Sequence, residues 1–223
     1  MACDGLLEAD PARYLAVLRS AFDGHYAEAS DVWTADQEMR AFPAVVLGYR
    51  GRQSSPAALR VLDVGCGAGR DVEYFARSCA SVVGLDLHPH AEWSAVAGRR
   101  PNAAFVETDL VGYTTAPGGF DLVFDNGCFH HQHPTQYGAY LAQVNRMLAS
   151  NGWYVLSTFK NDALKERLDD RGRLHRYFTD SELHAVLAES SLVVLHELDV
   201  WRERHRDYYR LTCCGPARAP NAP

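Results

Sequence analysis

The segment that most restricts the fold is a short apolar run that leads directly into a glycine-rich turn. Residues 60–65 read Arg-Val-Leu-Asp-Val-Gly, as in a buried strand, and glycines recur at positions 65, 67 and 69 before a helical pattern begins. Glycine allows a tight turn and lets a ligand lie against the main chain. A dinucleotide fingerprint requires glycine at position 70, where this chain has Arg70, and a Walker loop requires Gly-Lys-Ser/Thr. The spacing therefore argues against NAD, FAD and a Walker-type phosphate site.

Short apolar runs alternate with longer amphipathic stretches on both sides of this turn. The predicted strands are 60–65, 81–86, 103–107, 120–125 and 152–159, and the predicted helices are 71–79, 89–98 and 136–149. Strands that alternate with helices of 10–15 residues are typical of parallel β-α-β units. The central part of the chain is therefore predicted to form an α/β sheet.

The last third of the chain has a different pattern. Thr179 and Glu182 form a capping box that predicts a helix to about Ser190. Two strand-like runs follow, 191–202 and 207–213, and only residues 203–206 separate them. A parallel crossover needs a dozen or more residues, so these strands must pair antiparallel. We expect a mostly parallel sheet that ends in an antiparallel hairpin.

The N-terminal segment is predicted to be helical. Apolar side chains recur at helical spacing over residues 11–47, and Pro11 suits a first helical turn. Residues 50–56 are typical of a linker, and residues 215–223 are typical of a frayed end. The pattern therefore predicts a helical cap with its linker (1–57), one α/β domain (58–214) and a flexible tail (215–223).

Composition and charge narrow the range of partners. The 223 residues are 47% hydrophobic and 22% charged, which is typical of a globular domain, and the formal net charge is −6. No general attraction to phosphate backbones or anionic lipid follows from that charge, so we expect neither nucleic acid nor membrane as partner. The acidic start of the chain lacks the features of a secretory signal, which predicts a cytoplasmic protein. The six cysteines show no zinc-type spacing, and we expect no metal.

Acidic residues follow the predicted strands. Asp86 ends the second strand about 20 residues after the first glycine, where a carboxylate can bind a ribose diol. Asp109 follows the third strand, where it can accept from the exocyclic amine of adenine. Asp63 and Asp125 complete an acidic rim at the strand ends. This rim suits a cationic nucleoside better than a phosphorylated nucleotide.

Five segments in register resemble the class I S-adenosylmethionine-dependent methyltransferases. Residues 61–69 resemble the first motif of that family, 84–86 the ribose-binding second, 108–109 the adenine-binding third, 120–127 the fourth, and 146–156 the last helix and fifth strand. The resemblance implies a doubly wound, Rossmann-like, seven-stranded and mostly parallel sheet with an antiparallel last strand. It also implies S-adenosylmethionine as cofactor and, carried over by position, contacts from Asp63, Gly65, Cys66, Gly67, Gly69, Asp86, Leu87, Asp109, Leu110, Asp125 and Asn126.

The run Asp125-Asn-Gly-Cys-Phe-His-His131 is most similar to small-molecule members of the family, including thiol and thiopurine methyltransferases. A base helps when the acceptor is a thiol, hydroxyl or amine, and the candidates are His130, His131 and His133, with His130 and His131 the predicted catalytic pair. Loop histidines with no chemical role are the alternative. Tyr26 and Trp33 are the predicted acceptor contacts, from a segment that would lie over the cofactor.

The sequence predicts a cytoplasmic small-molecule methyltransferase, with a place in specialised biosynthesis as a further expectation. Two alternatives stay open. An enzyme of the same fold could attack the aminocarboxypropyl arm of the cofactor and release methylthioadenosine, and a protein could bind the cofactor without turnover. The acceptor, the base and the oligomeric state are not determined by these residues.

Overall fold

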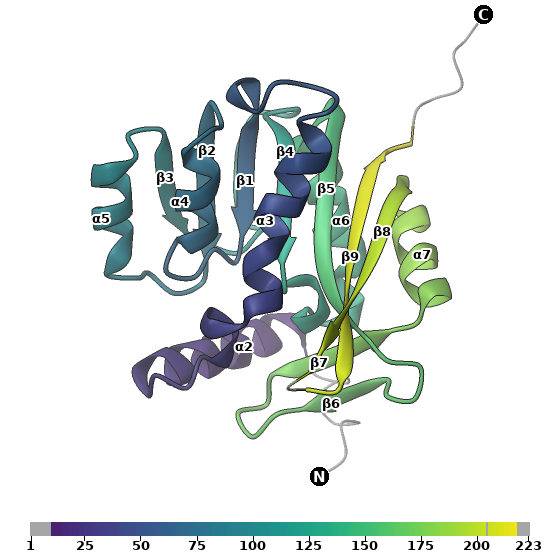
Figure 1. Ribbon diagram of the computed structural model, residues 1–223. Coiled ribbons are helices and arrows are strands. Elements are labelled where there is room, and N and C mark those ends of the chain that lie inside the picture. Colours follow the sequence, from purple (N-terminus) through teal and green to yellow (C-terminus); the bar gives the residue numbers. More distant parts are fainter. Residues whose placement is uncertain (1–9, 204, 218–223) are drawn as a thin grey trace, which may run out of the picture.

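Strand β1 (Arg60–Val64) lies at the centre of the sheet and runs parallel to both of its neighbours. The computed structural model describes residues 10–203 and 205–217. Its core strand order is β3-β2-β1-β4-β5, followed by β9 and β8 (Figure 1). The remaining bounds are β2 Ser81–Asp86, β3 Ala103–Glu107, β4 Phe120–Asn126, β5 Leu148–Lys160, β8 Leu192–Arg202 and β9 Asp207–Pro216.

Strand β9 pairs antiparallel with both β5 and β8, so the predicted antiparallel hairpin closes the sheet. The seven predicted strands are all present in this Rossmann-like, mostly parallel α/β sheet, and β9 is the antiparallel one among them. Two further short strands from the insertion after β5 bring the sheet to nine. Strand β9 extends through Gly215 and Pro216, two residues into the predicted tail. The rest of that tail, from residue 218 onward, lies outside the described residues, as does the start of the cap before residue 10.

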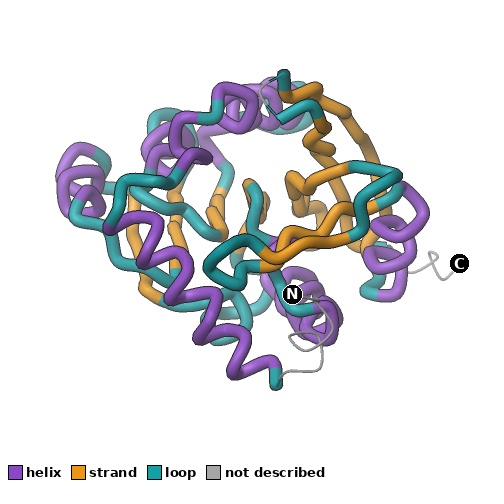
Figure 2. Tube along the Cα trace, turned by 90° about the horizontal axis from the view of Figure 1, so that it is seen from below, coloured by secondary structure: helices purple, strands orange, loops and turns teal. Residues whose placement is uncertain are grey.

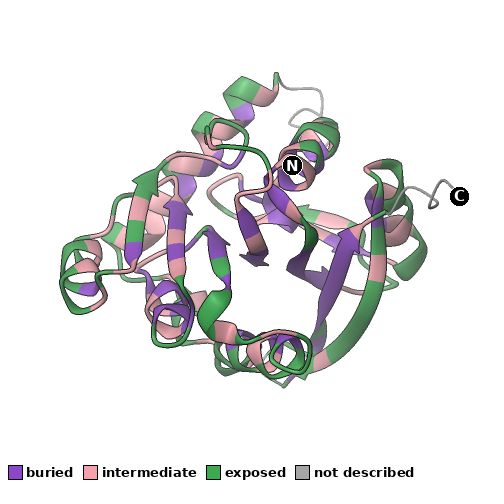
Figure 3. Cartoon of the chain, turned by 90° about the horizontal axis from the view of Figure 1, so that it is seen from above, coloured by how far each residue is buried: buried purple, intermediate pink, exposed green. Residues whose placement is uncertain are grey.

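Side chains point alternately to the two faces of the sheet, and this produces two separate core layers. Val61 of β1 packs with α3 (Gln37–Arg50), α4 (Arg70–Ala76) and α5 (Glu92–Arg99) on one face. Its neighbour Leu62 packs with α6 (Tyr137–Met147) and α7 (Asp180–Glu189) on the opposite face. Successive side chains of a strand point to opposite faces, which explains why the adjacent apolar residues of β1 serve different layers. Buried residues accordingly line the inner sides of the sheet and its helices (Figure 3).

The insertion after β5 forms a second, short hairpin, which the sequence patterns do not predict. Strands β6 (Glu166–Leu168) and β7 (Leu174–Phe178) pair antiparallel, and β7 continues the main sheet by pairing with the last two residues of β5. Three residues of β6 are too few to show a strand period. Gly172, at φ 84°, supports the turn between them.

Helix α2 (Pro11–Ala27) and this hairpin lie across the carboxyl ends of the parallel strands (Figures 1 and 2). Tyr14 and Leu18 of α2 form a small third core with Leu174 of β7. The Tyr14 hydroxyl donates to the main-chain oxygen of His131 (2.6 Å) and accepts from the amide of Leu174 (3.0 Å). Three segments that are distant in sequence therefore close together over the end of the sheet where ligands bind in such folds.

Candidate functional site

The glycine turn after β1 adopts a backbone that favours glycine. Gly65, Gly67 and Gly69 have φ of 69°, 52° and 86°. A Cβ at Gly65 would lie 1.9 Å from the Cys128 sulfur, and one at Gly69 would lie 2.7 Å from the ring of Phe105. Both the left-handed dihedrals and the close packing therefore require these glycines. The turn leads directly into α4, as the sequence predicts.

Asp86, at the end of β2, holds this turn in place. Its carboxylate accepts from the amides of Gly67 (2.8 Å) and His88 (2.9 Å). Burial raises the pKa of Asp86, and the two amide hydrogen bonds act in the opposite direction. Asp109, past the end of β3, accepts from the amide of Gly112 at 2.5 Å. Two carboxylates thus stand at adjacent strand ends, where the sequence predicts ribose and adenine contacts.

A cavity of about 580 Å³ extends from the glycine turn to the hairpin of β6 and β7. The predicted site residues that line it are Gly65, Asp86, Leu87, Asp109, Leu110 and Asn126 from the cofactor set, together with Tyr26, Trp33, His130 and His131. Asp63, Cys66, Gly67, Gly69 and Asp125 are outside the lining. The structure therefore brings most, and not all, of the predicted residues to one cavity.

The carboxylate of Asp125 is fully hydrogen-bonded by groups of the chain itself. Its Oδ1 accepts from the amides of Cys128 (2.8 Å) and Phe129 (3.1 Å), and its Oδ2 accepts from the hydroxyls of Tyr140 (2.6 Å) and Tyr154 (3.0 Å). Burial raises its pKa against these four hydrogen bonds. Four donors satisfy a carboxylate, so Asp125 organises the turn after β4, and its contact with the cofactor stays a prediction.

Asp63 and Asn126 both lie near Asp71, beneath the glycine turn. Oδ2 of Asp63 is buried with no hydrogen-bond partner among the described residues, and burial, reinforced by the charge of Asp71, raises its pKa well above the usual value. Asn126 donates to Asp71 (3.0 Å) and to the main-chain oxygen of Met39 (3.1 Å), and accepts from Ser157 (3.0 Å). An unpaired buried carboxylate oxygen beside this turn fits a positively charged ligand group.

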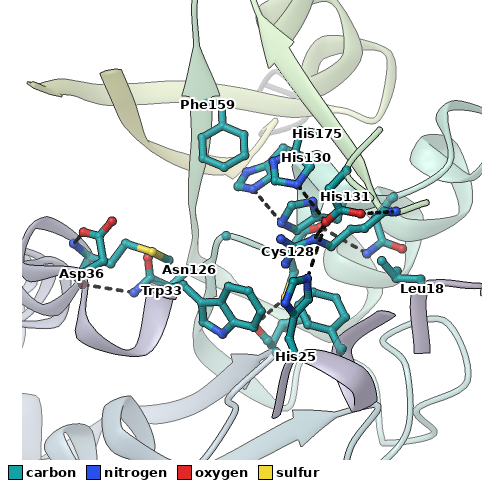
Figure 4. Close-up of a pocket in the computed structure, with 18 of the residues that line it drawn as sticks. Leu18, His25, Trp33, Asp36, Asn126, Cys128, His130, His131, Phe159 and His175 are labelled. Atoms are coloured by element: carbon teal, nitrogen blue, oxygen red, sulfur yellow. Dashed lines mark hydrogen bonds and ion pairs between the residues drawn. The ribbon is translucent and has the colours of Figure 1, made fainter. Parts of the chain in front are cut away.

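One wall of the cavity, between the glycine turn and the hairpin of β6 and β7, is aromatic. Trp33 packs edge-on against Phe22 and Tyr26, and donates to the Tyr26 hydroxyl at 3.4 Å. The guanidinium of Arg173 lies 4.7 Å from the centre of the Trp33 ring, and Asp169 neutralises it at 2.9 Å. The predicted pair Tyr26 and Trp33 thus shares a wall with a buried ion pair. Figure 4 shows Trp33 in this wall.

Several lining residues were not predicted from the sequence. Phe159 lies at the end of β5, where its ring is 3.9 Å from that of His130 and stacks on His175 and Tyr209. Arg202, from β8, lies 4.8 Å from the centre of the Phe159 ring and pairs with Asp207. These residues come from four strands, so only the folded sheet assembles them. The buried aromatic at the end of the fifth strand was the one available hint.

The three histidines after β4 have different surroundings. His130 and His131 are buried and line the cavity. His133 is buried outside the lining, and its Nδ1 lies 2.8 Å from the Thr135 hydroxyl in a local turn.

Within residues 10–203 and 205–217, no three His, Cys, Asp or Glu side chains are grouped to hold a metal. No helix of that part of the chain is long and apolar enough to cross a bilayer.

Comparison with known proteins gives consistent matches. The model of the methyltransferase domain family matches residues 61–152. A 1,6-didemethyltoxoflavin-N1-methyltransferase of Burkholderia thailandensis, crystallised with 1,6-didemethyltoxoflavin and S-adenosylhomocysteine, superposes with a TM-score of 0.87 at 33% identity, over 94% of this chain and 92% of that one.

Curated relatives match over shorter stretches. An uncharacterized methyltransferase of Synechocystis is 35% identical over 97 residues, which is 44% of this chain and 45% of that protein. The cyclopropane-fatty-acyl-phospholipid synthase of Escherichia coli is 36% identical over 101 residues, 45% of this chain and 26% of the synthase. The match to these relatives thus spans half of their length or less, whereas the match to the Burkholderia enzyme is nearly complete. The chain belongs to the class I S-adenosylmethionine-dependent methyltransferase family.

Proposed function

We propose that this protein is an S-adenosylmethionine-dependent methyltransferase whose acceptor is a ring nitrogen of a small planar heterocycle. The observation that carries the proposal is the near-complete similarity to the Burkholderia N-methyltransferase, a protein crystallised with such a heterocycle. The cavity supports it, because aromatic side chains line the end that faces away from the glycine turn. Thiol and hydroxyl acceptors, which the sequence left open, are the alternatives that the experiment below separates.

The cofactor end of the cavity is proposed to lie at β1, β2 and β3. Asp86 binds the ribose hydroxyls, Asp109 faces the adenine amine, and Leu87 and Leu110 hold the adenine ring. The main chain at Gly65 lies against the ligand, and the unpaired oxygen of Asp63 attracts its ammonium group across the glycine turn. Cofactor binding would thus use residues 58–214, with the N-terminal helices as a cap.

When bound, S-adenosylmethionine supplies an electrophilic methyl group next to a positively charged sulfur. The chain's own contribution is alignment of the acceptor, because an in-line displacement depends on the position of the attacking atom. Tyr26 and Trp33 stand between the two ends of the cavity and can hold a planar ring in that position. A cytoplasmic role in biosynthesis accords with such a reaction.

The first test incubates the purified full chain with S-adenosylmethionine, with and without 1,6-didemethyltoxoflavin. Mass spectrometry then quantifies S-adenosylhomocysteine, methylthioadenosine and methylated acceptor. We expect S-adenosylhomocysteine and the methylated heterocycle in equal amounts, and only when the acceptor is present. Methylthioadenosine formed without acceptor would instead support chemistry on the aminocarboxypropyl arm. Binding without turnover on heterocycles, thiols and phenols would support a cofactor-binding protein.

A further inference from the structure

His130 and His131 form a hydrogen-bonded pair in the wall of the cavity. The two Nε2 atoms are 3.1 Å apart. Nδ1 of His131 lies 2.5 Å from the main-chain oxygen of Leu174 in β7. Both rings are buried and line the cavity, beside Phe159 and His175 (Figure 4). The pair therefore lies at the acceptor end, within a short chain of hydrogen-bonding atoms.

The positions of the protons follow from what each atom can do. A carbonyl oxygen only accepts, so Nδ1 of His131 carries a proton and neutral His131 has a bare Nε2. A hydrogen bond between the two Nε2 atoms then requires the proton to be on His130. Nδ1 of neutral His130 is consequently left with a lone pair. That atom is buried, and no described residue makes a hydrogen bond to it.

The surrounding elements keep both rings neutral and in place. Burial lowers the pKa of His130 and His131 well below the usual 6.5. Nearby positive charge lowers them further: for His130 the groups are His175, Arg202 and Arg173, while the main chain of Ser157 in β5 acts in the opposite direction. The Tyr14 hydroxyl links the main chains of His131 and Leu174. This link fixes the distance between Nδ1 of His131 and the main-chain oxygen of Leu174, on which the tautomer of His131 depends.

We propose that His130 is a catalytic residue that receives, at Nδ1, the proton of an acceptor whose reacting nitrogen is a neutral ring N–H. His131 is a positioning residue that holds His130 in the required tautomer. The inference rests on the proposed function and adds both the proton acceptor and the protonation state of the substrate. A substrate that already lacks this proton would not need His130.

The step balances without a further reactant. The lone pair of the ring nitrogen forms the new bond to carbon, and the electrons of the carbon–sulfur bond leave with the sulfur. As this bond forms, the ring N–H becomes strongly acidic, so its proton passes to Nδ1 of His130 in the same step even though the pKa of His130 is low. The product nitrogen is then neutral and carries the methyl group in place of its proton. His130 becomes an imidazolium that later releases the proton to water.

The first measurement needs no acceptor. Histidine side chains of the full-length protein, labelled with ¹⁵N, are examined by NMR at pH 7, with the His130→Gln and His131→Gln variants used to assign the signals. We expect His131 as the Nδ1–H tautomer and His130 as the Nε2–H tautomer. Detection of His130 as the Nδ1–H tautomer, or as an imidazolium, would overturn the proposal, because Nδ1 would then have no lone pair.

The second measurement uses single turnovers with saturating S-adenosylmethionine and 1,6-didemethyltoxoflavin. His130→Gln keeps an N–H in reach of His131 and lacks the base, so we expect a loss of about 100-fold in the methylation rate. The affinity for S-adenosylmethionine, measured by calorimetry, should be unchanged. His184→Gln is the control, since His184 lies on α7 and pairs with Glu197 outside the cavity.

The pH profile separates a chemical from a structural role. The wild-type rate should fall as the pH falls through the pKa of His130, which lies below 6.5, and this acid limb should vanish in His130→Gln. The charged and titratable groups around the pair are His175, Arg173, Arg202, Asp207 and Tyr209, and they are the same in both proteins. An unchanged rate in His130→Gln would overturn the proposal. Wild-type protein that binds no S-adenosylmethionine would instead contradict the proposed function, and the tautomers would still test His130.

Discussion

Asp86 is hydrogen-bonded by the chain before any ligand is considered. Its carboxylate joins the amides of Gly67 and His88, so it both shapes the glycine turn and presents charge to the cavity. Asp86→Asn removes the charge and one acceptor. We expect a loss of about 2–3 kcal/mol in cofactor binding, as for hydrogen bonds to a charged group. Calorimetry with S-adenosylhomocysteine should show this as a 30- to 150-fold weaker affinity, roughly.

A pH series tests the same carboxylate. The pKa of Asp86 is raised, so the ionised form is lost as the pH falls through a value above 3.8. Wild-type affinity should therefore weaken as the pH falls from neutral through that pKa, whereas that of Asp86→Asn should change less. Glu107→Gln is a matched control, because Glu107 ends β3 and pairs with Arg19 outside the cavity lining. Equal affinities for wild type and Asp86→Asn would place the ribose elsewhere.

Asp63 presents the opposite case, a buried charge that costs stability. Its raised pKa means that the folded state favours the protonated form, so the full penalty applies above that pKa and shrinks as the pH falls below it toward the unfolded value of 3.8. We expect Asp63→Asn to stabilise the fold by about 1 kcal/mol at pH 8, or roughly 2–4 °C in Tm, and to weaken cofactor binding.

The matched control for that substitution is Asp121→Asn. Asp121 pairs with Arg60 at 2.9 Å, and hydrogen bonds from Arg60 outweigh burial and lower its pKa, so its loss should lower Tm at neutral pH. Thermal unfolding at pH 8 and pH 5 shows whether each substitution raises or lowers Tm. A destabilised Asp63→Asn protein with normal cofactor affinity would mean that Asp63 stabilises the glycine turn alone.

Individual site residues could be predicted where the signal is local. The glycine turn, Asp86 and Asp109 stand at fixed distances along the chain from buried strands, and the structure brings Gly65, Asp86 and Asp109 to one cavity. Phe159 and Arg202 could not be predicted, because they reach the cavity only through the pairing of β5, β9 and β8. Asp125 stands at a strand end like Asp86, and only its four donors reveal that it is fully hydrogen-bonded.

At the scale of elements, the regular part of the fold was predictable. Parallel strands that are buried on both faces appear in the sequence as continuous apolar runs, and the capping box of Thr179 and Glu182 opens α7 as expected. Strands β6 and β7 were missed, since the turn that joins them is held by one side chain. Asp169 accepts from the amides of Arg171 and Arg173 and from the Arg173 guanidinium.

Removal of the Asp169 carboxylate should destabilise the hairpin of β6 and β7 and leave the rest of the fold unchanged. The pKa of Asp169 is lowered because the hydrogen bonds and charge of Arg173, with further donors, outweigh its burial. We expect Asp169→Asn to increase hydrogen exchange over residues 166–178 and to slow methylation at least tenfold, with cofactor affinity retained. The exchange difference should fade at strongly acidic pH, where wild-type Asp169 is protonated too. Asp162→Asn, an exposed change in the same insertion, is the control; a matching effect there would contradict the assignment.

Across the whole molecule, the cavity has two ends of different electrostatic character. Asp86 and Asp109 stand near the glycine turn without cationic partners in their hydrogen-bond sets. At the other end the buried acids are ion-paired: Asp169 with Arg173, and Asp36 and Asp207 with Arg202. A cationic cofactor and a neutral, electron-rich acceptor would therefore prefer opposite ends, which places the two reactants in order along one cavity.

This asymmetry predicts which acceptors the protein binds. An aliphatic ammonium at the far end would meet the guanidinium groups of Arg173 and Arg202, whose acidic partners are already engaged, and would lose its hydration without a counterion. A planar heterocycle with carbonyl groups would contact Trp33 and Phe159 in the cavity wall and accept hydrogen bonds from the same guanidinium groups. With S-adenosylhomocysteine present, xanthine and lumazine should raise Tm, and spermidine and phenethylamine should leave it unchanged. If the amines raised Tm more than the heterocycles, that result would contradict both the assignment of the two cavity ends and the proposal of a heterocyclic acceptor.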